Sequence, residues 1–166
     1  MSFINNRRKA DDPSAFKATF GRFATGVAVV TCAPEGEPPM GVTINALASV
    51  SLDPALALFC LDDRATALSS FLRAGHFALN ILAEDQADLS NRFASEHALR
   101  DDDPTEIWDS GAPVLRNALS VADCVLLDTH GGGDHVILLG RVVQVGYRED
   151  AAPLLYYGGG YGKFTP

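Results

Sequence analysis

The sequence predicts a mainly β protein, an antiparallel barrel with a few short helices packed outside it. Runs rich in β-branched and apolar residues recur along most of the 166-residue chain, and turn residues separate them. One run, residues 41–52, alternates apolar and polar side chains, which is the period of a strand with one buried face. Helical spacing appears in only a few short segments. Many strands and few helices favour the barrel.

The first half of the chain opens with a helix expected over residues 13–22. Asp12 is a good N-cap and Pro13 suits the first helical turn, and Phe16 and Phe20 then recur at helical spacing. Strands are expected at residues 26–32, as a pair within residues 41–52, and at residues 55–61, with turns at 34–39 and 53–54.

The second half alternates in the same way. A helix is expected over residues 66–73, with Gly75 in the usual place for a helix C-terminus. The elements expected after it are a strand at 76–82, a helix at 85–93, a loop at 101–104, and strands at 118–128 and 135–147 around a glycine-rich connection. The tail is first apolar and then rich in glycine.

Length and composition indicate a single domain, residues 13–166, after an N-terminal extension of residues 1–12. Thirteen basic and twenty-one acidic residues give a net charge of −8, which opposes binding to a nucleic-acid backbone. We expect no membrane association, because no apolar run could cross a bilayer and the N-terminus lacks a signal-peptide core. The three cysteines are widely separated in apolar runs, which favours buried thiols in a reducing cytoplasm.

The polar face of residues 41–52 contains no charge. It presents Thr43, Asn45, Ser49 and Ser51, whereas a strand facing water usually carries lysine, glutamate or arginine. Small uncharged donors and acceptors suit a surface that lies close to a flat polar ligand. The same side chains could equally bond to neighbouring backbone. The pattern alone supports both interpretations.

Three motifs suggest other chemistries but lack the required context. Residues 130–133 are similar to the oxyanion strand of lipase-like hydrolases, yet the chain has no Gly-x-Ser-x-Gly elbow. The glycines at 158–162 have the wrong spacing for a dinucleotide fingerprint, and too few residues follow for the receiving helix. His130 and His135 have no third ligand at metal-binding spacing. We therefore expect no hydrolase triad, Rossmann site or metal site.

Small polar and charged residues remain at the ends of several elements. Residues 25–27, Thr-Gly-Val, join the first helix to the next strand. Arg64 and Thr66 stand where a strand passes into a helix, and amides at a helix start, with a cation and a hydroxyl, can hold a phosphate. Residues 133–135, Gly-Asp-His, open a late strand.

In the order and spacing of these stretches, the chain resembles the short-chain flavin reductases, which adopt the FMN-binding split barrel. The resemblance extends over residues 16–161, nearly the whole chain. It rests on FATGVAVVT (23–31), GVTINALASVSLDPALALFCL (41–61), HFALNILAEDQADLSNRFA (76–94), GGDHVILLGRVVQV (132–145) and LLYYGGGY (154–161).

The resemblance implies a homodimer that uses NADH or NADPH to reduce FMN or FAD, and a separate monooxygenase that receives the reduced flavin by diffusion. It implies a catalytic role for His135, which would guide the nicotinamide. A break in the strand between Asn45 and Ser49 would bring backbone amides to the flavin ring. The flavin-binding residues that it implies are Thr25, Gly26, Val27, Thr43, Asn45, Ala46, Ser49, Ser51, Arg64 and Thr66.

Two features depart from the family pattern. Ala46 and Leu47 stand where family members often have serine and phenylalanine. Asp62 and Asp63 lie in the loop expected to approach the flavin phosphate and would oppose an anion if they faced it. The choice between FMN and FAD therefore stays open.

Two further hypotheses compete with the reductase. The first is a non-catalytic split-barrel protein that binds flavin as a sensor or carrier. The second, an enzyme like pyridoxamine-phosphate oxidase, is disfavoured because the chain has no basic cluster suited to the phosphate of that substrate. Turnover of a nicotinamide with a flavin separates the first hypothesis from the reductase.

Overall fold

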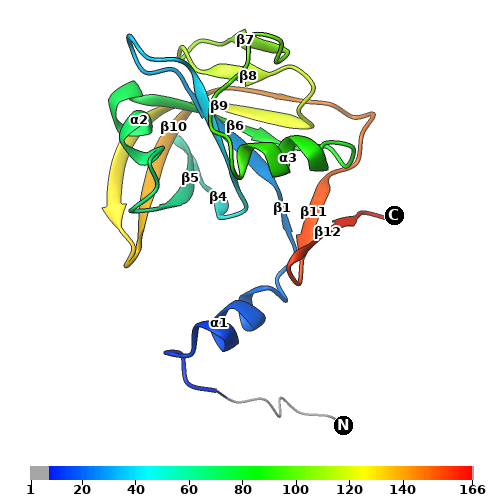
Figure 1. Cartoon of the computed structure of the whole chain (residues 1–166). Helices are drawn as coiled ribbons and strands as arrows, with labels where there is room; N and C mark the ends of the chain where they lie inside the picture. Colours follow the sequence, from blue (N-terminus) through cyan, green and yellow to red (C-terminus); the bar gives the residue numbers. More distant parts are fainter. Residues whose placement is uncertain (1–7, 166) are drawn as a thin grey trace.

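The computed structural model describes residues 8–165, and its centre is a curled antiparallel sheet (Figure 1). The helices are α1 (Pro13–Phe20), α2 (Leu68–Ala74) and α3 (Ala87–Phe93). The strands are β1 (Thr25–Gly26), β2 (Ala28–Cys32), β3 (Met40–Ile44), β4 (Leu47–Leu52), β5 (Ala55–Asp62), β6 (His76–Ile81), β7 (Thr105–Ile107), β8 (Pro113–Leu115), β9 (Ser120–Gly131), β10 (His135–Tyr147), β11 (Leu154–Tyr157) and β12 (Gly160–Lys163). Seven of them form the main sheet, in the order β3-β2-β6-β9-β10-β5-β4.

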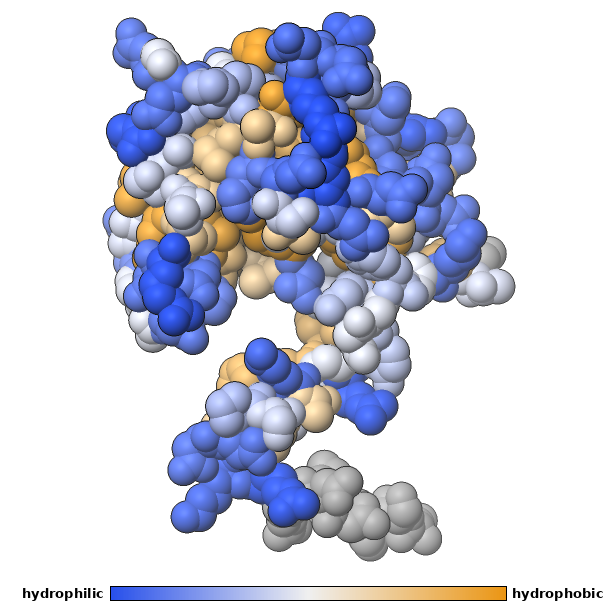
Figure 2. All heavy atoms as spheres, viewed as in Figure 1, coloured by the Kyte–Doolittle hydropathy of each residue, from blue (hydrophilic) through white to orange (hydrophobic). Residues whose placement is uncertain are grey.

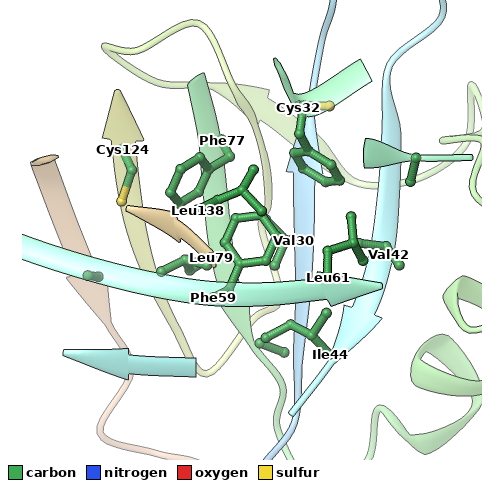
Figure 3. Close-up of a cluster of buried hydrophobic side chains, with 14 residues drawn as sticks. Val30, Cys32, Val42, Ile44, Phe59, Leu61, Phe77, Leu79, Cys124 and Leu138 are labelled. Atoms are coloured by element: carbon green, nitrogen blue, oxygen red, sulfur yellow. The ribbon is translucent and has the colours of Figure 1, made fainter. Parts of the chain in front are cut away.

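The main sheet curls until its two edges approach each other. β3 and β4 stand at opposite ends of the strand order, yet Val42 and Ile44 of β3 pack in one buried cluster with Phe59 and Leu61 of β5 (Figure 3). Phe59 also meets Phe77 of β6 edge to face, with ring centroids 5.0 Å apart. The barrel therefore remains open between β3 and β4. The predicted mainly β, antiparallel fold is confirmed, and the barrel is split rather than closed.

Most of the predicted elements are confirmed, with shifted ends. α1 begins at Pro13 as expected, with the Asp12 carboxylate accepting from two backbone amides of its first turn, but it ends two residues early. α2 begins at Leu68 instead of residue 66, and Gly75 ends it in the left-handed conformation, with a φ of 67°. The hairpin of β7 and β8 has no counterpart among the predicted elements. The first seven residues of the predicted extension lie outside the described residues.

The strand pair expected within residues 41–52 is confirmed as β3 and β4. The two strands are separated at Asn45 and Ala46, within the segment where a break was expected. This corner carries the chain from one edge of the sheet to the other, because β3 pairs with β2 and β4 pairs with β5.

The expectation of one continuous apolar face along residues 41–52 is wrong for β4. Val42 and Ile44 of β3 are only 7% and 8% exposed, whereas Val50 and Leu52 of β4 are 49% and 97% exposed. Both strands lie at an edge of the sheet, but β3 packs into the barrel interior on one face and against α3 on the other. In the part of the chain that the structure describes, β4 has no such cover, and a bulge in its middle shifts its register against β5 and interrupts the alternation.

The remaining elements cover the outside of the barrel unevenly. α3 and β8 close a second buried cluster on the outer face of β2 and β6, which includes Val29, Phe93 and Val114. β1, β11 and β12 form a small separate sheet. α1 projects away from the body and contains no buried residue (Figure 1). Within residues 8–165, none of the helices has the length and apolar character that a membrane crossing requires.

Candidate functional site

A groove of about 310 Å³ opens at the rim of the barrel, where β1 leads into β2 and β3 turns into β4. Its volume falls at the small end of the range for small-molecule sites. Its lining contains no charged side chain. The lining residues are Phe23, Ala24, Thr25, Gly26, Val27, Ala28, Ile44, Asn45, Leu47 and Ile81.

The fold holds one wall of this groove firmly in place. Val27 is buried, and its carbonyl accepts from the backbone amide of Leu82 at 2.9 Å. Ala28 pairs with Ile44 on one side and with Ile81 on the other. This wall of the groove is therefore part of the sheet, so a ligand would meet a preformed surface.

Thr25 and Gly26 leave room and bonding capacity in the groove. The Thr25 hydroxyl is buried without a hydrogen-bond partner, which is uncommon for a buried polar atom. A side chain at Gly26 would have no other heavy atom within 4 Å, so the fold itself does not require glycine there. Both observations fit a polar ligand that lies close to the backbone and bonds to the hydroxyl.

The corner between β3 and β4 supplies the opposite wall. The Asn45 side chain is exposed at the groove, and the Asn45 carbonyl accepts from the Leu47 amide at 3.1 Å. The Ala46 carbonyl accepts from the Cys60 amide at 3.0 Å, which ties the corner to β5. The corner therefore exposes small groups while remaining fixed to the sheet.

Six of the ten predicted flavin-binding residues are not part of the groove lining: Thr43, Ala46, Ser49, Ser51, Arg64 and Thr66. Thr43 is turned toward α3, because its hydroxyl donates to the Ser90 carbonyl at 2.7 Å. Ser49 and Ser51 lie on β4 beyond the groove, on either side of the bulge. Thr25, Gly26, Val27 and Asn45 are the predicted residues that the structure brings together there.

Arg64 lies in the loop between β5 and α2, where nearby carboxylates offset its charge. Its Nε and Nη2 donate to the Asp62 carboxylate, each at 3.2 Å, and Asp63 lies 3.8 Å from Nε. The hydrogen bond with Arg64 lowers the pKa of Asp62 and raises the pKa of Arg64 itself. Thr66 is exposed in the same loop, and Ala67, not Thr66, occupies the N-cap of α2. The attraction of this loop for a phosphate is therefore weakened but not abolished.

His135 opens β10 directly opposite Asp62 of β5. Its Nδ1 lies 2.7 Å from an oxygen of Asp134, and the hydrogen bond with His135 lowers the pKa of that carboxyl group. With Nδ1 held in this way, Nε2 is the ring nitrogen left to meet a ligand. The side chain is half-exposed, which leaves it accessible.

The strand register places His135 and the groove at the same end of the barrel. Cys60 of β5 is bonded to the groove corner through Ala46, and Asp62, two residues further along β5, pairs with His135. Arg64 stands two residues after Asp62, in the loop. The groove, the arginine loop and the histidine thus follow one another along a single rim.

Several groove residues were not predicted from the sequence. Phe23 stands two residues before Thr25, so its nearness in sequence could have suggested it. Leu47 was noted only as a departure from the family pattern. Ile81 enters the groove because β6 pairs with β2, and no local signal in the sequence indicates that contact.

The split barrel thus carries a neutral, preformed groove at its open rim, beside a strand corner. Comparison with known proteins identifies the class. Residues 20–165 match the family described as "Flavin reductase like domain". The chain belongs to this family.

Relatives of known name agree with this assignment. The chain is 40% identical over 156 residues to the FMN reductase (NADH) SmoA of Agrobacterium fabrum, a match that covers 93% of this chain and 88% of that protein. It is 36% identical to the flavin-dependent monooxygenase reductase subunit HsaB of Rhodococcus jostii, over 95% of this chain and 81% of that protein. Its fold matches the NADH:FAD oxidoreductase SgcE6 of Streptomyces globisporus with a TM-score of 0.90 and 31% identity, over 97% and 98% of the two chains.

Proposed function

We propose that this chain is a flavin reductase that transfers a hydride from NADH or NADPH to FMN or FAD. The observation that carries the proposal is the unpartnered, buried Thr25 hydroxyl in a neutral groove, beside the open space at Gly26. Family membership and the named relatives support it, because SmoA is an NADH-dependent FMN reductase and SgcE6 an NADH:FAD oxidoreductase.

The residues of the groove fit the edge of a flavin ring. Thr25 would supply a hydrogen bond to a ring carbonyl or nitrogen, and Gly26 and Val27 would let the ring approach the backbone closely. Asn45 and Ala46 would contact the ring from the opposite wall. When bound, the flavin supplies the redox chemistry as the hydride acceptor. The protein therefore needs no strong acid or nucleophile in this groove.

The charged part of the rim suits the remaining parts of the two ligands. Arg64 and Thr66 would hold the flavin phosphate, after Arg64 exchanges part of its bonding to Asp62 for the ligand. His135 would hold the nicotinamide cofactor through Nε2, with its ring oriented by Asp134. Thr43, Ser49 and Ser51 would contribute to the flavin site only indirectly in the single chain. The principal task of Arg64, Thr66 and His135 is to keep the hydride donor and the hydride acceptor in contact.

We propose a separate monooxygenase as the recipient of the reduced flavin, since HsaB is named as a reductase subunit of such a system. We also propose a homodimer, because β4 leaves two large apolar side chains exposed at the rim. The chain has three free cysteines, two of them buried, and free thiols support a reducing compartment such as the cytoplasm. We take residues 13–166 as one functional domain.

The test is a nicotinamide oxidation assay with each of the four pairings of NADH or NADPH with FMN or FAD. Turnover with at least one pairing is expected. Absence of turnover with all four would reject the reductase, and flavin retained on the purified protein would then identify a non-catalytic flavin carrier or sensor.

The role of His135 is tested by His135→Ala, with His130→Ala as the matched control. His130 is also an exposed histidine beside an aspartate, and it lies across from Ile137 in the same hairpin, so it controls for the loss of a neighbouring histidine that does not open β10. His135→Ala should raise KM for the nicotinamide cofactor by about tenfold or more, while the flavin Kd stays within about twofold. His130→Ala should change neither value. Equal losses in both values for His135→Ala would indicate a structural role instead.

A further inference from the structure

The two groove residues of β1 lie outside the main sheet. Thr25 and Gly26 precede β2, and within residues 8–165 their one partner strand is β11, which pairs in turn with β12. β11 is attached to the body at its first residue, where the Leu154 amide donates to the Leu82 carbonyl at 3.0 Å. On the face that Figure 2 shows, mainly polar and neutral residues surround the turn between β11 and β12. The position of Thr25 therefore depends on the contacts that hold β11 and β12.

A row of three side chains crosses this small sheet. Thr25 is the register partner of Tyr156, and Tyr156 is the register partner of Tyr161. Side chains that stand directly opposite each other in an antiparallel pair lie on the same face and contact each other. The two tyrosine rings meet edge to face, with centroids 5.8 Å apart. The row therefore connects Tyr161 on β12 with the Thr25 hydroxyl in the groove.

The outer end of this row is bonded to α3. The Tyr161 hydroxyl donates to the Ser90 hydroxyl at 2.8 Å and lies 3.1 Å from Oδ1 of Asn91. Ser90 is fully buried in the helix, so its hydroxyl oxygen is an acceptor in a fixed position. The bond therefore fixes β12, the edge strand of the small sheet, to an element that packs on the main sheet.

The same serine also holds the strand that leads to the opposite wall of the groove. Its carbonyl accepts from the Thr43 hydroxyl at 2.7 Å. Thr43 is followed by Ile44 and Asn45, which both line the groove. Ser90 is thus bonded to β3 through its carbonyl and to β12 through its hydroxyl. One residue of α3 connects the two elements between which Thr25 and Asn45 face the groove.

We infer that Tyr161 is a positioning residue of the groove. Its bond to Ser90 holds β12 in place, and through Tyr156 it holds the Thr25 hydroxyl where a ligand meets it. Tyr161 does not itself line the groove. Thr43, a predicted flavin-binding residue, contributes in the same way, through its bond to the serine. The inference rests on the proposed function only for the identity of the ligand as a flavin.

Tyr161→Phe tests the bond, because it removes the hydroxyl and keeps the ring against Tyr156. Kd for FMN and for FAD, measured by flavin fluorescence quenching, should rise about three- to fivefold. KM for the nicotinamide cofactor and kcat at saturating flavin should stay within about twofold of the wild-type values. The matched control is Tyr157→Phe, which removes a tyrosine hydroxyl from the opposite face of β11 and should leave both Kd values unchanged. Unchanged Kd values for Tyr161→Phe would overturn the inference.

A double-mutant cycle with Thr25→Val separates positioning from a general loss of structure. If Tyr161 acts through the Thr25 hydroxyl, adding Tyr161→Phe to Thr25→Val should weaken flavin binding by less than about 1.5-fold more. If Tyr161 only stabilises the small sheet, the losses of the two single variants should multiply. Multiplied losses would therefore overturn the inference even where each single variant binds flavin more weakly than the wild type.

Amide hydrogen exchange in the ligand-free protein provides a measurement that does not depend on flavin. Peptides that contain β1 and β11 should exchange at least about fivefold faster in Tyr161→Phe than in the wild type, because the small sheet opens more readily. Peptides from β9 and β10 of the main sheet are the internal control and should exchange at the wild-type rate. Unchanged exchange at β1 would show that the bond of Tyr161 does not hold this strand, and the inference would fail.

The failure of the proposed function has a different signature. A wild type that neither binds nor reduces flavin would reject the proposed function. The exchange of β1 in Tyr161→Phe would still decide whether Tyr161 holds the Thr25 wall of the groove, so the two failures are distinguishable.

Discussion

β3 and β4 derive from one alternating stretch of sequence but lie in opposite environments. Val42 and Ile44 of β3 are buried, while Val50 and Leu52 of β4 are 49% and 97% exposed. β3 faces the interior of the barrel and meets β5 across it, as Figure 3 shows for Val42 and Leu61. Each of the two strands has a single neighbouring strand, but β3 is covered by α3 on its other face, whereas β4 has a bulge in its middle. Alternation therefore defines two faces of a strand but does not determine what covers either face.

The difference assigns separate tasks to the two strands. β3 contributes to the core and, through its pairing with β2, positions the wall of the groove that is part of the sheet. β4 contributes little to the core of the single chain and leaves its surface available for binding. The corner at Asn45 and Ala46 joins the two, so the groove lies where the packed part of the sheet becomes the exposed part.

The largest expected effect is a difference in the free energy of unfolding between a substitution on β3 and one on β4. Ile44→Ala should lower the free energy of unfolding by about 2–4 kcal/mol, because it removes most of a buried side chain from the core. Leu52→Ala should change it by less than about 0.5 kcal/mol, because Leu52 is 97% exposed in the single chain.

Urea unfolding of the two variants and of the wild type measures both values. Similar losses for Ile44→Ala and Leu52→Ala would contradict the contrast between β3 and β4.

The sequence was sufficient for the features that depend on local patterns. The capped start of α1 at Asp12, the left-handed end of α2 at Gly75 and the strand-rich architecture all follow from residue types and spacing. Residues 25–27, which stand at the junction of two elements and were predicted to bind the flavin, line the groove.

The features that depend on distant neighbours could not be predicted from the sequence. Thr43 lies on the polar face that the alternation predicts, but that face packs against α3, and the Thr43 hydroxyl donates to the Ser90 carbonyl. Ser49 and Ser51 follow the same alternation until a bulge between them changes the register. Ile81 reaches the groove only through the pairing of β6 with β2. Neither the packing of a helix nor the position of a bulge is encoded in the period of one strand.

A second comparison concerns two buried hydroxyls, one in the groove and one in the core. Thr25→Val removes a hydroxyl that has no partner in the chain, so the protein should keep its stability while flavin affinity falls about five- to tenfold. Thr31→Val is the matched control, because the Thr31 hydroxyl donates to Pro113 and accepts from Asn80.

Thr31→Val should lower the free energy of unfolding by about 1–3 kcal/mol and leave flavin affinity unchanged. Thermal unfolding and flavin titration measure the two effects. If Thr25→Val destabilised the free protein and bound flavin normally, its hydroxyl would have a structural role instead of a ligand.

The smallest expected effect concerns the charge on the exposed side of the rim. Asp62→Asn should release Arg64 from a carboxylate that now accepts two of its hydrogen bonds, so the guanidinium becomes more available to a phosphate. KM for FMN should fall by about two- to threefold at low ionic strength and return toward the wild-type value in high salt. Asp128→Asn, an exposed aspartate on β9, removes the same charge elsewhere and should have no such effect.

Riboflavin, which lacks the phosphate, provides the decisive substrate for this prediction. If Arg64 contacts the phosphate, Asp62→Asn improves KM for FMN and leaves KM for riboflavin unchanged. Equal improvement for both flavins, or equal improvement by Asp128→Asn, would mean that only the overall negative charge of the protein had been reduced. The phosphate would then bind elsewhere on the rim, and the loop between β5 and α2 would have no direct part in holding the flavin.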